Sequence, residues 1–94
     1  MPEQANLTEA ALPTLTRAHI ADRITDHLAG ASSDAQLSKW AFDQFYKIEL
    51  ETLQLEEPYA ELLAEILDEL MFADEPGFQL ANADLQALVA RLRI

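Results

Sequence analysis

The chain contains no cysteine, and this absence removes several classes of chemistry. It has no disulfide framework, no thiol nucleophile and no thiolate metal site. Glycine is scarce as well, because two residues are few for a chain built from tight β-hairpins. Six Lys and Arg stand against 17 acidic residues, giving a net charge of -11. Since contacts with phosphate depend on Lys and Arg, we expect no binding to nucleic acid or to an anionic membrane.

Long apolar runs are also missing. No segment approaches the roughly 18 apolar residues that are needed to span a bilayer. The chain opens with Met-Pro-Glu, which places an acid where a signal peptide has its positive charges. We therefore expect a soluble cytoplasmic protein. Half of the residues are apolar, which excludes a disordered chain and predicts a folded core.

The first firm helix signal comes after a proline-containing lead. Residues 1–15 are expected to form a flexible N-terminal lead, with at most one helical turn near residues 7–12, and residues 16–94 a single helical domain. Thr16 is a plausible N-cap for a helix over 17–29, and Gly30 follows where a left-handed C-terminal cap belongs.

Three further helices are predicted. Ser32 or Ser33 can cap a second helix, whose apolar stripe is so broad that it suggests contact with two neighbours and whose end is not defined by the pattern. The third runs from about Pro58 to residue 72 or 73, because proline is well placed in a first turn, and Asp74-Glu75-Pro76-Gly77 ends it. The fourth begins near Asn82.

We therefore predict an all-α fold, a compact bundle of about four helices. The apolar positions that recur at helical spacing form the expected core: Ile20, Ile24, Leu28, Leu37, Trp40, Ala41, Phe45, Ile48, Leu62, Leu63, Ile66, Leu67, Leu70, Leu85, Leu88 and Leu92. Met71-Phe72, with Phe78 across the Pro-Gly turn, reads as a packed corner rather than a binding patch.

Candidates for catalysis and metal binding are weak. His19 and His27 stand eight residues apart, whereas a chelating pair on a helix needs a spacing of about one turn. Paired carboxylates such as Glu65 and Asp68 are expected to face solvent, where they do little acid-base work. We expect a protein that is not an enzyme, with no catalytic residue, no metal and no cofactor.

The most informative feature is a run of ten acidic residues between Glu49 and Glu75 without a single Lys or Arg. Its middle is an amphipathic helix, with one polar stripe formed by Glu61, Glu65, Asp68 and Glu69. Like charges at this spacing repel one another and cost a few tenths of a kcal/mol per pair. The stripe therefore either is tolerated as a solubilising surface or is kept because a basic partner docks against it.

Two functions follow from these patterns. The leading hypothesis is a protein-binding module that presents Glu61, Glu65, Asp68 and Glu69 to a basic protein partner. The alternative is a structural homodimer in which surplus apolar surface pairs two chains across a symmetric interface. The residues expected on that surface are Phe42, Tyr46, Leu53 and Met71.

Three phrases resemble a group of short acidic bacterial proteins: Leu37-Ser-Lys-Trp-Ala41, the segment from Glu69 to Leu80, and Asp84-Leu-Gln-Ala-Leu88. The likeness covers about residues 17–93 and implies no activity. In size, acidity and helix count the chain also resembles colicin-type immunity proteins, which neutralise basic nuclease toxins through an acidic helical surface. That resemblance implies an immunity-like or antitoxin-like role. It carries over no site residue, because Glu57-Pro58-Tyr59 departs from the adjacent tyrosines before proline of that family.

Overall fold

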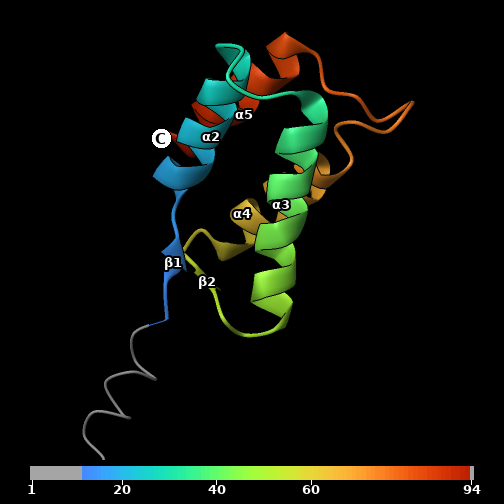
Figure 1. The fold of residues 1–94 in the computed structure, drawn as a ribbon. Coiled ribbons are helices and arrows are strands. Elements are labelled where there is room, and N and C mark those ends of the chain that lie inside the picture. Colours follow the sequence, from blue (N-terminus) through green and yellow to red (C-terminus); the bar gives the residue numbers. More distant parts are fainter. Residues whose placement is uncertain (1–11, 94) are drawn as a thin grey trace, which may run out of the picture.

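Residues 12–93 are described by a computed structural model, and in this part of the chain the regular structure is dominated by four helices (Figure 1). The helices are α2 (Arg17–Leu28), α3 (Asp34–Glu49), α4 (Ala60–Met71) and α5 (Asn82–Leu92). The prediction of an all-α bundle of about four helices is confirmed. Most of the expected lead, including most of the helical turn near residues 7–12, lies outside the described residues.

Local signals explain where the first two helices begin and end. The Thr16 hydroxyl accepts a hydrogen bond from the backbone N–H of His19 at 3.1 Å, which caps α2. Ser33 caps α3 in the same way through the N–H of Gln36, also at 3.1 Å. Gly30 has a φ of 90°, the left-handed conformation expected of a residue just after a helix.

Two segments far apart in the chain form a short parallel pairing that the sequence pattern does not predict. Strand β1 (Thr14–Leu15) pairs with β2 (Gln54–Leu55), so the chain that enters α2 lies beside the chain that leads into α4. The backbone N–H of Gln54 donates to the carbonyl of Pro13, and that of Glu56 donates to the carbonyl of Leu15, each at 3.0 Å. This pairing buries Leu15.

The helices pack mainly as two pairs, with α3 against α4 and α2 against α5, and the two pairs share one core (Figure 1). Most of the predicted core positions are buried: Ile20, Ile24, Leu37, Ala41, Leu63, Ile66, Leu67, Leu70, Leu85, Leu88 and Leu92. Four others are half-buried and pack against this core: Leu28, Trp40, Ile48 and Leu62.

One core prediction is wrong. Phe45 remains 37% exposed, and Phe42 and Tyr46 on the same helix are more exposed still. The reason is that α3 packs extensively on α4 but only slightly on α2, so one side of its broad apolar stripe has no helix against it. The expectation that this helix touches two neighbours holds only weakly, and the surplus apolar surface faces solvent.

A buried hydrogen bond joins α3 to the end of α4. Ser38 is a buried polar residue, and its hydroxyl donates to the carbonyl of Met71 in the last turn of α4. That carbonyl lies among the last four of the helix, which have no partner within the helix itself.

Among the described residues, no helix combines the length and the apolar character needed to cross a bilayer.

Candidate functional site

Helix α4 separates apolar and acidic side chains onto opposite faces. The inner positions Leu63, Ile66, Leu67 and Leu70 are fully buried against the rest of the core. The outer positions form the acidic face, defined as Glu61, Glu65, Asp68 and Glu69, and all four residues are exposed. The helical phase read from the sequence therefore places these four carboxylates as expected.

Charge at the end of α4 opposes the helix dipole. The last turns of α2, α3 and α5 carry His27, Lys47 and Arg91, whereas the last turn of α4 carries no basic residue. Instead, Asp68 and Glu69 lie next to the negative C-terminal end of α4, where anionic side chains are unfavourable. The buried leucines and isoleucine hold α4 in place despite this electrostatic cost.

Little of the acidic face is neutralised within the protein. Glu65 accepts a hydrogen bond from Nη2 of Arg91 on α5 at 2.7 Å, and both side chains are about half exposed. In the described part of the chain, no ion pair reaches Glu61, Asp68 or Glu69. Three of the four carboxylates are thus available to an external cation.

The four residues expected on an oligomer surface separate into two groups. Phe42 and Tyr46 are 55% and 58% exposed on α3. Leu53 is half-buried against the core, and Met71 is only 8% exposed within it. The expectation is therefore wrong for Met71 and weak for Leu53, because both side chains are used inside the fold.

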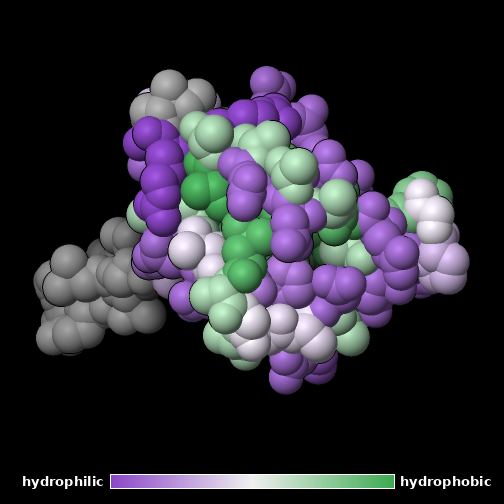
Figure 2. All heavy atoms as spheres, turned by 90° about the horizontal axis from the view of Figure 1, so that it is seen from above, coloured by the Kyte–Doolittle hydropathy of each residue, from purple (hydrophilic) through white to green (hydrophobic). Residues whose placement is uncertain are grey.

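The structure also corrects the interpretation of the turn after α4. Phe72 and Phe78 contact one another, with ring centroids 6.1 Å apart, but they are 45% and 65% exposed rather than packed away. The connection between α4 and α5 projects from the helices in Figure 1, and in Figure 2 the projection on the same side shows green at its upper edge beside white and pale purple. We call Phe42, Phe72 and Phe78 the aromatic corner.

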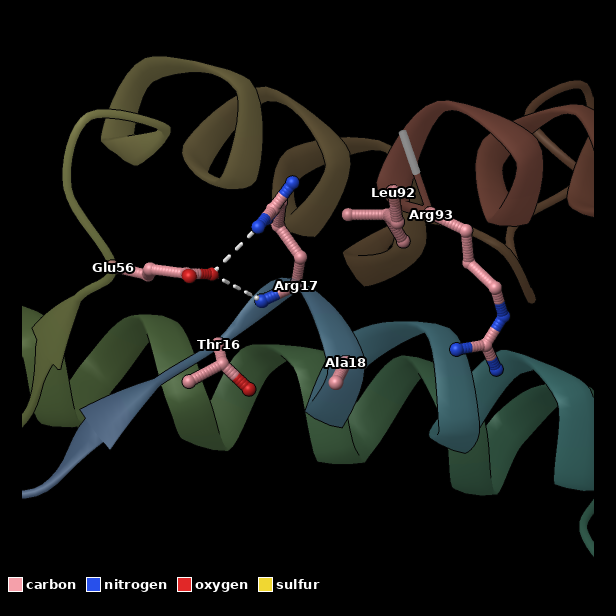
Figure 3. Close-up of a pocket in the computed structure, with 6 residues that line it drawn as sticks. All are labelled: Thr16, Arg17, Ala18, Glu56, Leu92 and Arg93. Carbon is pink, nitrogen blue, oxygen red and sulfur yellow. Dashed lines mark hydrogen bonds and ion pairs between the residues drawn. The ribbon is translucent and has the colours of Figure 1, made fainter.

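A second cluster surrounds the N-terminus of α2 (Figure 3). Oε1 of Glu56 accepts hydrogen bonds from the backbone N–H of Arg17 at 2.9 Å and from its Nε at 3.3 Å. The guanidinium lies 3.8 Å from the centre of the Tyr59 ring. These three residues form what we call the Arg17 junction. A shallow hollow of about 520 Å³ beside it is also lined by Leu92 and by Arg93, whose side chain points away from Glu56 in Figure 3.

Electrostatics at the Arg17 junction favours the ionised carboxylate. The hydrogen bond from the backbone N–H of Arg17 is the main cause that lowers the pKa of Glu56, with further lowering by the Arg17 side chain. A lowered pKa does not suit a general acid near neutral pH. The geometry instead serves the fold, because Glu56 lies at the positive end of α2 and joins it to the segment that leads into α4.

The two histidines also have separate structural settings. Nδ1 of His27 lies 2.8 Å from the Ser32 carbonyl, and because a carbonyl can only accept, Nδ1 carries the hydrogen. Nε2 of the same ring lies 3.0 Å from Oδ1 of Asp34, so His27 links α2 to the start of α3. His19 contributes to the N-cap of α2. Within residues 12–93, no three His, Asp or Glu side chains come together in a group that could hold a metal ion.

Comparisons of this chain with models of protein families, with curated proteins and with solved structures find no match.

Proposed function

We propose that this protein is a non-enzymatic binding module that presents the acidic face of α4 to a basic protein partner. The observation that carries the proposal is the exposure of Glu61, Asp68 and Glu69 on one helix face, with no cation paired to them in residues 12–93. Their mutual repulsion and their place near the negative end of α4 make the arrangement costly for the fold alone.

Electrostatic attraction between the acidic protein and a basic partner acts before the two molecules touch. With a net charge of -11, the protein repels other acidic molecules and attracts basic ones. At physiological ionic strength the field of exposed carboxylates extends over about 8 Å, so it can orient a basic surface before contact. An immunity-like or antitoxin-like role is a specific form of this function, in which the basic partner is a toxin that must be blocked.

The test compares two charge-reversed variants that alter the net charge equally. One variant combines Glu61→Lys, Asp68→Lys and Glu69→Lys on the acidic face. The control combines Asp26→Lys, Glu49→Lys and Glu57→Lys, three exposed positions elsewhere. Partner capture from bacterial lysate is measured for both variants and the wild type at about 0.1 M and about 1 M salt, where the Debye length falls from about 10 to about 3 Å.

The expected result is local rather than global. The wild type and the control should capture a basic protein at low salt, whereas the acidic-face variant should lose it. Equal capture by the two variants would show that only total charge matters and would contradict the proposal.

The alternative function is a homodimer that pairs through Phe42 and Tyr46 on α3. The observation that favours it is their exposure of 55% and 58%, which is high for aromatic side chains. Net charge opposes it, since two copies at -11 repel each other. Sedimentation at micromolar concentration tests the homodimer. A dimer that Tyr46→Ser dissociates would support this alternative, and a strict monomer would exclude it.

A further inference from the structure

A shallow groove lies between α3 and the end of α4. It has a volume of about 500 Å³, and its apolar lining includes Phe42, Met71 and Phe72. Met71 is buried and contributes to the core, whereas the two phenylalanines are about half exposed. The groove therefore combines a base fixed by core packing with aromatic walls that another molecule can cover.

A second hollow adjoins the groove and shares Phe72 with it. Its volume is about 350 Å³, and its lining consists of Asp68, Glu69, Phe72, Phe78 and Leu80. Because Phe72 lines both hollows and its ring contacts Phe78, the aromatic corner is continuous from α3 to the α4–α5 connection. Two residues of the acidic face, Asp68 and Glu69, belong to the same lining.

Carboxylates surround this apolar surface on both sides. Asp74 and Glu75 line the first hollow, and Asp68 and Glu69 line the second. In the described part of the chain none of these four forms an ion pair, whereas Asp43 in the first hollow is paired with Lys39 at 3.1 Å. Apolar walls weaken the screening of nearby charges, and phenylalanine rings attract cations at their faces.

We infer that the aromatic corner receives an apolar side chain from a basic segment of the protein partner, with flanking Lys or Arg residues paired to Asp68, Glu69, Asp74 and Glu75. The inference deepens the proposed function and rests on it. It assigns the partner two chemical features, an apolar anchor and positive charges on either side of it.

Charge complementarity selects this occupant over two others. A second copy of the chain would bring its own carboxylates against those that surround the groove, and an anionic lipid surface would be repelled in the same way. A purely polar basic segment would leave Phe42, Phe72 and Phe78 in water, where they gain nothing from binding. Only a segment that is both basic and amphipathic satisfies the acids and covers the rings.

The experiment uses two synthetic helical peptides of equal length and equal positive charge. One places Leu between Lys residues at helical spacing, and the other has Ser in place of each Leu. Affinity for the full chain is measured by fluorescence anisotropy at about 0.1 M and about 1 M salt. Amide chemical shifts of the labelled protein identify the residues that respond.

The expected result is a preference for the Leu peptide by at least about fivefold, the loss typical of truncating one interface anchor. Phe72→Ser with Phe78→Ser should abolish that preference while salt-dependent binding of both peptides remains. Phe78→Ser alone, at a 65% exposed position in a connection, should reduce it without affecting the helices. Tyr46→Ser is the matched control, because the exposure of Tyr46, 58%, lies between those of Phe72 and Phe78 and the residue lines neither hollow.

Equal affinity for the two peptides would overturn this inference, and so would a preference that survives the double variant. The proposed function fails separately, if reversing Glu61, Asp68 and Glu69 leaves the salt-dependent binding of both peptides unchanged. Helical circular dichroism of each variant confirms that it is folded.

Discussion

The Arg17 junction and the aromatic corner use the same kinds of side chain in opposite ways. At the junction, Arg17 is held by the Glu56 carboxylate and lies over the Tyr59 ring, so acid, cation and aromatic satisfy one another. At the corner, Phe72 and Phe78 contact each other, and no ion pair in the described residues reaches the nearby Asp68, Glu69, Asp74 or Glu75, since Lys39 in the same hollow is paired with Asp43. One region is complete as it stands, and the other lacks its positive component.

This difference teaches where to look for function in a chain with so few cations. Five of the six Lys and Arg side chains form hydrogen bonds or ion pairs within the protein: Arg17 with Glu56, Arg23 with Ser32, Lys39 with Asp43, Arg91 with Glu65 and Arg93 with Asp22. Most of these contacts join elements of the fold. The unpaired carboxylates beside exposed aromatic rings are therefore a surface that an external basic group can complete.

The largest expected effect is a difference in stability between a variant of the inner face of α4 and a variant of the aromatic corner. Leu70→Ala should destabilise the protein by about 2–5 kcal/mol, because Leu70 is fully buried and its truncation leaves a cavity. Phe78→Ser should change stability by no more than about 0.5 kcal/mol, as expected of an exposed residue. Urea unfolding measures both. Similar losses in the two variants would mean that the corner supports the fold, and the contrast between the regions would disappear.

A smaller effect is expected beneath the groove. Ser38→Ala should cost about 1 kcal/mol, because it removes the buried hydrogen bond to the Met71 carbonyl. Thr25→Ala is the matched control, since its hydroxyl donates to the Ala21 carbonyl at 2.8 Å in a hydrogen bond that is only partly buried, on an exposed residue of α2. Thermal unfolding should show a larger loss for the first variant than for the second. Equal losses would show that burial of the bond has no influence.

The Arg17 junction should be sensitive to pH. The pKa of Glu56 is lower in the folded protein than its ordinary value of 4.5, so its ionised form stabilises the native state. That contribution is fully present above pH 4.5 and is lost as the pH falls through the lowered folded value. Glu56→Gln should therefore be less stable than the wild type at pH 6, with a difference that shrinks toward pH 3. A difference independent of pH would assign the effect to shape rather than charge.

The smallest effect should come from the ion pair beside the groove. Lys39 and Asp43 are 77% and 50% exposed and stand one helical turn apart on α3. Lys39→Ala should change stability by no more than about 0.5 kcal/mol at low salt and by less at high salt. The same variant should bind the basic Leu peptide more tightly than the wild type does, because loss of Lys39 frees Asp43 to pair with the peptide. Weaker binding by Lys39→Ala would show that this lysine contributes to the surface.

The sequence predicted the helices well because their signals are local. Thr16, Ser33 and Gly30 act within one turn of their own helix, and Pro58 restricts the start of α4. The outward phase of the acidic face followed from the same logic, since a helix of known start has only one way to place its charges. The β1–β2 pair could not be predicted, because two residues carry no alternation and their partners lie 40 positions apart.

The features that the sequence did not predict depend on how the helices are placed relative to each other. Phe45 and Phe42 belong to an apolar stripe that resembles core, and only the one-sided packing of α3 leaves them exposed. The Arg17 junction joins residues with a separation of 39, which no periodicity reveals. The aromatic corner combines both difficulties, because its three rings come from a helix, a helix end and a connection.

The β1–β2 pair is expected to have low local stability. Closing a loop of this length costs entropy that two backbone hydrogen bonds repay poorly, so the pair depends on α2 and α3 being in place. Structure that depends on so few backbone hydrogen bonds opens before the middle of a long packed helix does. The backbone amides of Gln54 and Glu56 should therefore exchange with deuterium before those in the middle of α4. An opening that also breaks the hydrogen bonds between Arg17 and Glu56 would detach the start of α2 from the segment that leads into α4 while the helix with the carboxylates stays closed.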